Sequence, residues 1–483
     1  METSVNAEAL LPILLGLLLA VTPGTLSANP GLVARITGKG LEYAAKEGLL
    51  ALQRDLHKIT LPDFTGDFKI RPIGRGHYDF HSLEIHSCEL PHSTLKPLPG
   101  QGLSLSISDS SIGVQGRWKV RKSFAKLQGS FDLLVQGLAI SVDLLLGTDP
   151  SGRPTVTAPR CSSRIYDVDV DISGGLGWLL NLFHNQIESR FRKVLEDKIC
   201  EMVQKSVASD LQPYLQTLPV TAKIDSLAGI DYSLVEAPQA TAQALDMMFK
   251  GEIFNLHNRS EVAAHAPVMS LPEDHEKMVY FAISSYVFNT ASHVYHQAGY
   301  LSFFITDDMI PSDSTIRLTT KSFRAFAPRI ARLYPNMNLE LQGAVIAVPL
   351  LNLSPGNLSL APQMDIQAFV LLPSSAQEPV FRLAVGTNIS AMLTLDTNKV
   401  TGFLNPGKLQ VELKESNVGM FNVELLEALL NYYLLNTLYP QVNDKLAKGF
   451  PLPLLNRVQL YDLALQIHKD FLYLGANVQY TRV

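Results

Sequence analysis

The order helix, strands, helix occurs twice along the 483 residues of this chain, and no other feature constrains its fold as strongly. Apolar residues that recur every three to five positions predict long amphipathic helices. The expected helices span residues 29–59, 176–211, 279–299 and 423–438. Asn29 and Pro30 have the features of an N-cap and a first helical residue, whereas Pro213 and Pro440 are expected to lie just beyond helix ends.

Alternation of apolar and polar residues predicts antiparallel strands with one buried face between the helices of each half. The clearest strands lie at residues 103–107, 131–146, 167–172, 381–385 and 409–413. With 46% hydrophobic and 18% charged residues, the chain can bury large cores, which excludes intrinsic disorder. We therefore expect an α+β protein of two similar halves, with a linker at residues 236–270.

The amino-terminal residues have the pattern of a secretory signal peptide. An uncharged apolar run from Leu10 to Val21 is too short to span a bilayer, and Thr25 and Ser27 are small residues that suit cleavage before Ala28. We therefore expect residues 1–27 to be removed and the mature chain to be secreted. No other run of 18 uncharged apolar residues occurs, so the sequence shows no transmembrane anchor.

Secretion gives the three cysteines a structural meaning, because they allow one disulfide and leave one thiol. We expect Cys161 to pair with Cys200, since the first precedes a predicted strand and the second lies on the following helix. Cys88 is far from both in the sequence and is expected to stay free. The second half also carries N-glycosylation sequons at Asn258, Asn352, Asn357 and Asn388.

A cationic segment in the first half is the strongest candidate for a binding site. No Asp or Glu occurs between Asp109 and Asp132. The cations of this segment are Arg117, Lys119, Arg121, Lys122 and Lys126. Without internal counter-charges such a cluster can pair with phosphate, although composition alone favours an ordinary solvated face. On a strand, the cations at odd positions would share one face and Trp118 would take the other, with Phe124 close by.

The remaining motifs predict no metal, cofactor or catalytic chemistry. The histidines around Cys88 lack a recognised zinc spacing; they are His77, His81, His86 and His92. The run Asp167, Asp169, Asp171 begins like a calcium loop but lacks the required Gly and Glu. Signatures of hydrolases, phosphate-binding loops and zinc peptidases are missing, so we expect no enzyme. The formal net charge of −5 argues against nucleic acid as a partner.

Five segments resemble the family that comprises lipopolysaccharide-binding protein, bactericidal permeability-increasing protein, phospholipid transfer protein and cholesteryl ester transfer protein. They are ANPGLVARITGKGLEYAAKEGLLALQRDL, LPDFTGDFKI, GRWKVRKSFAKLQGSFDL, GWLLNLFHNQIESRF and NVELLEALLNYYLLNTLYP. The resemblance covers essentially the whole chain after the signal segment. It implies an elongated boomerang of two barrel-plus-long-helix domains, 28–235 and 271–483, joined by a central antiparallel sheet and carrying apolar pockets for phospholipid.

The resemblance also implies a function. The cationic segment would engage the phosphates of lipid A, the lipid part of bacterial lipopolysaccharide, with Arg121 and Lys122 as the most important pair. The secreted plasma protein would hand lipopolysaccharide monomers to a leucine-rich-repeat co-receptor, on monocytes or in serum, in the acute-phase antibacterial response. The nearly neutral amino half differs from the strongly cationic one expected of the bactericidal relative, which favours a carrier. General phospholipid or sterol-ester transfer and lipid hydrolysis are the alternatives.

Overall fold

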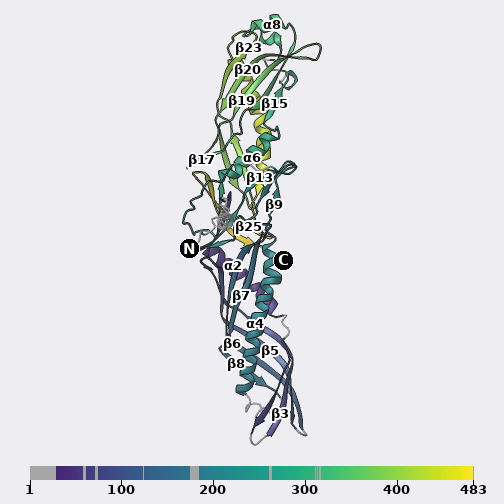
Figure 1. Cartoon of the computed structure of the whole chain (residues 1–483), viewed down its shortest axis with the longest axis vertical. Helices are drawn as coiled ribbons and strands as arrows, with labels where there is room; N and C mark the ends of the chain where they lie inside the picture. The colour runs from purple at the N-terminus through teal and green to yellow at the C-terminus, as the bar shows by residue number, and fades with distance from the viewer. Residues whose placement is uncertain are drawn as a thin grey trace, which may run out of the picture.

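The chain forms a long molecule in which two halves meet at a central antiparallel sheet (Figure 1). The computed structural model describes residues 29–57, 61–70, 74–122, 125–173, 184–259, 264–310, 312, 314 and 317–481. The predicted signal segment, residues 1–27, lies outside the described residues. Among the described helices, none is both long enough and apolar enough to cross a membrane.

Strands from both halves build the central sheet. In spatial order they are β11 (Gln239–Ala240), β12 (Ala244–Phe249), β1 (Leu32–Thr37), β14 (Val279–Ser284), β26 (Phe471–Tyr480) and β25 (Val458–His468). β1 and β14 pair antiparallel, with Leu32 opposite Ile283. Since each half contributes its first strand to this pair, the halves are joined through backbone hydrogen bonds at the middle of the molecule.

The predicted starts of the helices at 29–59 and 279–299 were wrong, because the first residues of each range form a strand of the central sheet. Helix α2 (Gly38–Leu56) follows β1, and helix α6 (Ser285–Gln297) follows β14. Thr37 caps α2 by accepting a hydrogen bond from the Gly40 amide, and Ser284 caps α6 by accepting one from the Tyr286 amide. A six-residue apolar strand buried on both faces cannot be distinguished by spacing from the first turns of a helix.

The other two expected helices extend past their prolines. α4 (His184–Ser206) continues through a π-helical turn, Val207–Leu211, into α5 (Gln212–Leu215), which contains Pro213. α9 (Glu424–Tyr433) continues through a second π-helical turn, Leu434–Leu438, into α10 (Tyr439–Lys448), which contains Pro440. The wider turn before each proline accommodates a ring that would clash with the backbone carbonyl four residues earlier in a regular α-helix.

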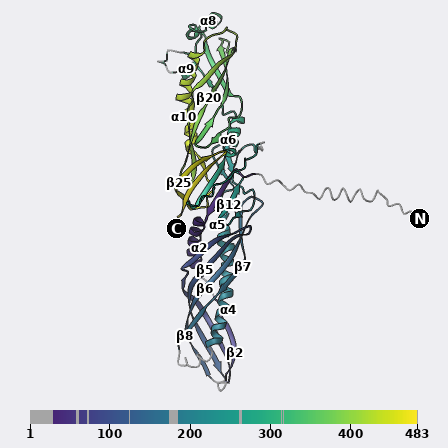
Figure 2. The same cartoon turned by 90° about the vertical axis from the view of Figure 1, so that its left-hand side faces the viewer.

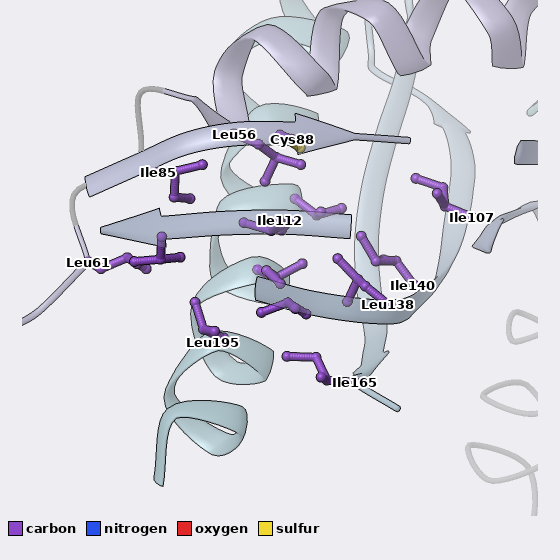
Figure 3. Packing of buried hydrophobic residues seen from close by; sticks show 14 of the residues in the cluster. Leu56, Leu61, Ile85, Cys88, Ile107, Ile112, Leu138, Ile140, Ile165 and Leu195 are labelled. Atoms are coloured by element: carbon purple, nitrogen blue, oxygen red, sulfur yellow. The ribbon is translucent and has the colours of Figure 1, made fainter. Parts of the chain in front are cut away.

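A curved sheet forms the amino half. Its strands are β2 (Phe64–Ile70), β3 (Gly74–Glu89), β5 (Gly102–Lys122), β6 (Ala125–Thr148) and β7 (Pro154–Arg164), with β4 (His92–Leu98) paired to β5 and β8 (Asp167–Ile172) paired to β6. These include the strands predicted at 103–107, 131–146 and 167–172. In the described residues β2 does not pair with β7, so the sheet curves without closing into a barrel. Leu56 of α2 and Leu195 of α4 pack into its apolar face beside Ile112 (Figure 3).

The carboxyl half consists of two sheets. One contains β15 (Ser302–Ile305), β16 (Asn338–Val345), β19 (Gln363–Leu371), β20 (Gln377–Thr387) and β23 (Leu409–Ser416). The other contains β17 (Asn352–Ser354), β18 (Asn357–Leu360), β21 (Ile389–Leu395), β22 (Lys399–Asn405) and β24 (Phe450–Pro451). Two short helices, α7 (Thr320–Phe323) and α8 (Pro328–Leu333), lie at the end farthest from the centre (Figure 1).

Residues 236–270, expected to be a linker, contain part of the sheet framework. β11 and β12 belong to the central sheet, and β13 (Glu252–Asn255) pairs with β10 (Ala228–Asp231), which in turn pairs with β9 (Thr221–Lys223). Ala240 and Leu245 also pack into the amino-half core. Polar residues at both ends of the stretch gave it the composition of a linker, while the apolar run that forms β12 is only six residues long.

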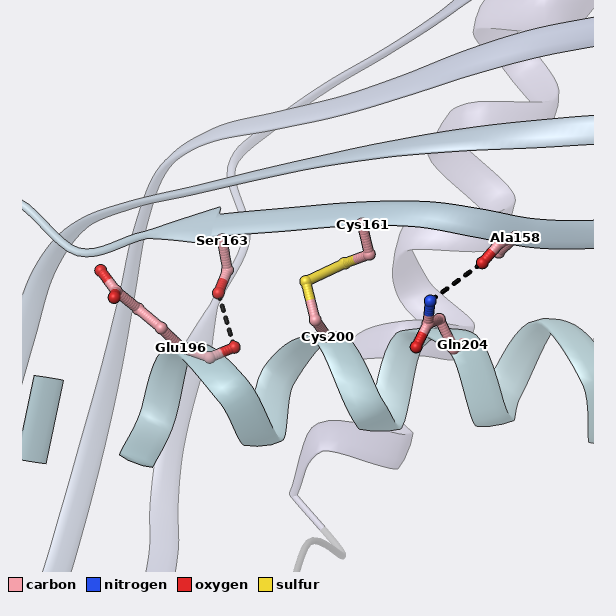
Figure 4. The surroundings of a disulfide bond; sticks show 6 residues. All are labelled: Ala158, Cys161, Ser163, Glu196, Cys200 and Gln204. Carbon is pink, nitrogen blue, oxygen red and sulfur yellow. Dashed lines mark hydrogen bonds between the residues drawn. A yellow bond between two sulfur atoms is a disulfide. The ribbon is translucent and has the colours of Figure 1, made fainter. Parts of the chain in front are cut away.

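The disulfide joins Cys161 on β7 to Cys200 on α4, which agrees with the predicted pairing (Figure 4). Their Cα atoms are 5.7 Å apart. On either side of it, the Ser163 hydroxyl donates to the Glu196 carbonyl at 2.7 Å, and the Gln204 amide donates to the Ala158 carbonyl at 3.0 Å. Helix and strand are therefore held together at three successive positions. Cys88 is free and buried, and burial raises the pKa of its thiol to about 11.

Candidate functional site

The cationic segment lies at the far end of the amino half, where the hairpins β2–β3 and β5–β6 end side by side (Figures 1 and 2). β5 and β6 form one long hairpin, in which Arg117 is opposite Ser130 and Lys119 is opposite Gln128. β3 pairs with the other edge of β5. The cations therefore project from a continuous sheet and do not lie on an isolated loop.

The alternation predicted for this segment is confirmed. Arg117 and Arg121 are exposed and Lys119 is half-buried, whereas Trp118 and Val120 are each only 3% exposed. Trp118, noted above as an aromatic neighbour of the cations, therefore belongs to the core. Lys126 is exposed on β6. Lys122 ends β5, but its side chain and all of Phe124 lie outside the described part of the structure.

Two further cations join this surface from β2 and β3. Lys69 and Arg75 are exposed and lie opposite each other in the β2–β3 hairpin. The sequence pattern did not reveal them, because both lie outside the continuous cationic run. The sequence signal for Lys69 is the alternation around it, which places Phe64 and Phe68 on the opposite, buried face. We call the set Lys69, Arg75, Arg117, Lys119, Arg121 and Lys126 the tip surface.

The tip surface has a local excess of positive charge. Near its six cations the outer face carries the carboxylates of Asp67 and Asp79, with that of Asp132 farther along β6. Asp67 contacts the His77 ring, with 2.9 Å between Oδ1 and Nδ1, and Asp79 lies opposite Lys119. Across the described residues, none of the six cations forms an ion pair. Their charges thus remain available to an external anion.

An aromatic core supports the tip surface from the inner face of the sheet. The rings of Phe64 and Phe80 stack with centroids 5.0 Å apart, and Phe191 of α4 meets Phe64 edge-on at 4.5 Å. The indole nitrogen of Trp118 donates to the carbonyls of Ser130 and Ser173. Gly129 lies opposite Trp118 on the neighbouring strand. A Cβ at position 129 would lie 2.7 Å from the indole nitrogen, so a larger residue would clash with the ring. Packing of this kind fixes the strands that carry the cations.

Other candidate sites differ from the tip surface. A cavity of about 290 Å³ between β23 and α9 is lined by Lys408, Glu424 and Glu427 as well as by apolar atoms, so its chemistry does not suit an acyl chain.

Among the described residues no group of three or more His, Cys, Asp or Glu side chains could hold a metal ion. The sequon residues Asn258, Asn352, Asn357 and Asn388 are all exposed.

Both halves of the chain match the LBP / BPI / CETP family: residues 40–215 match its N-terminal domain and residues 222–480 its C-terminal domain. Lipopolysaccharide-binding protein from Homo sapiens is 76% identical over 477 residues, which are 99% of each chain. The protein of that name from Mus musculus is 71% identical over 474 residues, 98% of each chain. A crystal structure of lipopolysaccharide binding protein, 69% identical, has a TM-score of 0.71 and covers 94% of this chain and 100% of that chain.

Proposed function

This chain belongs to the LBP / BPI / CETP family, and we propose that it is a carrier that binds bacterial lipopolysaccharide through the lipid A part at the tip surface. The observation that carries the proposal is the set of six cations on one face of four adjacent strands, without ion pairs among the described residues. Lipid A carries phosphate groups, and Arg and Lys bind phosphate through charge-assisted hydrogen bonds.

The geometry favours the capture of a phosphorylated headgroup over adhesion to any anionic membrane. The six cations of the tip surface lie together at one end of a chain whose formal net charge is −5. A strongly cationic body would remain attached to an anionic membrane, whereas a local cationic end can take up one lipid and release it. Transfer of an intact lipid requires no catalytic residue.

Acyl chains need an apolar environment once the headgroup is bound. We propose that they, and a resident phospholipid, occupy the interior between the curved sheet and the helices α2 and α4. This is supported by the apolar faces that both helices turn toward the sheet, which include Leu41, Phe191 and Ile199. Native mass spectrometry of the purified protein with its co-purifying lipids tests this part of the proposal.

Delivery to a co-receptor completes the proposal. The tip surface lies at one end of a long molecule, so a partner can bind the carboxyl half while lipid is held at the other end (Figure 2). We propose that the acceptor is a leucine-rich-repeat lipopolysaccharide co-receptor of innate immunity, and that the protein acts in plasma. Transfer from labelled lipopolysaccharide aggregates to such a receptor, with and without this protein, measures that step.

Charge reversal at the tip surface tests the binding step. The Arg121→Glu/Lys122→Glu variant should lose most lipopolysaccharide binding, because each cation near an anionic surface contributes about 1 kcal/mol and reversal adds repulsion. The matched control is Lys46→Glu/Lys205→Glu, which changes two exposed lysines on α2 and α4. Equal binding by the two variants would contradict the assignment of the tip surface.

A further inference from the structure

The opposite end of the molecule carries a second cationic surface, which differs in character from the first. No Asp or Glu occurs between Asp313 and Glu340. Within this stretch four cations are exposed: Lys321 on α7, Arg324 directly after it, and Arg329 and Arg332 on α8. None of these four forms an ion pair in the part of the chain that the structure describes.

Exposed apolar side chains lie next to these cations. Leu333, one helical turn after Arg329 on α8, is 50% exposed, and Met420, in the loop between β23 and α9, is 86% exposed. The loop and α8 are neighbours, since a Cβ at Gly419 would be 3.9 Å from Cδ of Arg329. The rings of Phe326 and Phe421 also contact, with centroids 6.0 Å apart. Cations and apolar groups thus share one surface.

Two carboxylates of the carboxyl half are already engaged by other cations. Asp307 is engaged by Arg317 at 2.7 Å, and Glu415 by Arg382 at 2.8 Å. A surface that combines unpaired Arg and Lys with protruding apolar side chains is complementary to an anionic lipid interface, where the cations meet headgroups and the apolar groups enter the acyl region. An acidic protein surface would match the charge, but it would not require a methionine that is almost fully exposed.

We propose that Lys321, Arg324, Arg329, Arg332, Leu333 and Met420 form a second, membrane-directed site, the carboxyl-end surface, which binds anionic phospholipid surfaces. It lies at the far end of the molecule from the tip surface (Figure 1). The protein can therefore contact two lipid particles at once. This inference does not depend on lipopolysaccharide being the ligand of the tip surface.

Vesicle flotation isolates the carboxyl-end surface when the tip surface is neutralised. In a full-length background with all six tip-surface cations replaced by Gln, called the tip-neutral chain, the protein should bind vesicles that contain phosphatidylglycerol but not vesicles of phosphatidylcholine alone. Adding Arg329→Gln/Arg332→Gln should weaken this binding by about 25-fold, at about fivefold per cation. Adding Met420→Ser should also weaken it, whereas adding Lys46→Gln/Lys205→Gln should leave it nearly unchanged. Thermal unfolding checks that each variant is folded.

Light scattering tests the two-ended arrangement with the tip surface intact. The wild-type chain should cross-link lipopolysaccharide aggregates to vesicles that contain phosphatidylglycerol, whereas Arg329→Gln/Arg332→Gln should still bind lipopolysaccharide but not cross-link the two kinds of particle. Equal flotation of the tip-neutral chain with and without Arg329→Gln/Arg332→Gln would overturn the proposal. Failure of the tip-neutral chain to bind either vesicle would also overturn it, and would favour an acidic protein as the partner. Loss of lipopolysaccharide binding alone bears only on the proposed function.

Discussion

Arg121 and Lys126 lie directly opposite each other on β5 and β6, and among the described residues neither has a carboxylate partner. Like charges at directly opposed positions in an antiparallel sheet destabilise it. The tip surface therefore lowers stability in the free protein, and an anionic ligand would remove that repulsion. A surface selected for folding alone would be expected to carry an opposite charge at one of the two positions.

This repulsion predicts that Arg121→Gln stabilises the protein while it weakens lipopolysaccharide binding. We expect a gain of about 0.2 to 1 kcal/mol in the free energy of unfolding, the typical range for one cross-strand pair. Urea denaturation of the amino half measures it. Lys126→Gln should give a similar gain, and the double variant no more than either alone; a fall in the urea midpoint of both single variants would contradict the interpretation.

Lys69 and Arg75 are predicted to contribute to binding although they lie outside the cationic run. Lys69→Gln/Arg75→Gln should weaken lipopolysaccharide binding by roughly 2 kcal/mol and reduce its salt dependence, because two of the cations facing the phosphates are lost. Titration at two ionic strengths measures both effects. Binding equal to that of Lys46→Gln/Lys205→Gln would restrict the site to β5 and β6.

Loss of the disulfide should lower the stability of the amino half. Cys161→Ala/Cys200→Ala removes a covalent loop closed across a sequence separation of 39, worth about 4 kcal/mol in the loop-entropy model. Differential scanning calorimetry should show a lower midpoint for the amino half. Cys88→Ala should cost only about 1 kcal/mol, as a small deletion in the core. A smaller loss from the double variant than from Cys88→Ala would contradict this prediction.

The buried Cys88 thiol should be protected from alkylation near neutral pH. Its raised pKa, about 11 against an ordinary value near 9, means that very little thiolate exists at pH 8. Since the folded-state pKa is the higher one, the thiol favours the folded state below pH 9, and this contribution is lost as the pH rises through about 11. Iodoacetamide labelling followed by mass spectrometry should be slow at pH 8 and rapid after denaturation. Rapid labelling of the native protein would contradict the burial.

The position of β1 predicts where the amino half can be separated. A chain that ends at residue 236 lacks β12 and β14, so β1 would lose both neighbours and expose an unpaired edge. A chain that ends at residue 256 keeps β12 and the core contacts of Ala240 and Leu245. We expect the longer fragment to be the more soluble one, and to bind lipopolysaccharide without delivering it. Size-exclusion chromatography and co-receptor loading measure these outcomes.

Local patterns in the sequence determined the features that depend on neighbouring residues. Alternation identified strands within β5, β6 and β8, and the spacing of Arg117, Lys119 and Arg121 placed them on the face opposite Trp118. The element order predicted two halves, and the cysteine positions predicted the disulfide. These predictions succeed because a period of two or of about three and a half residues is a property of the chain itself.

Only the tertiary structure decided which strands meet. Residues 32–37 and 279–284 have the composition of either a strand or a helical turn, and they are strands because each lies between two partners from distant parts of the chain. The nonlocal pairing of β3 with β5 brings Lys69 and Arg75 to the tip surface. Tertiary packing places Gly419, the neighbour of Met420, beside Arg329. Contacts between residues far apart in sequence fix these positions, and no local periodicity records them.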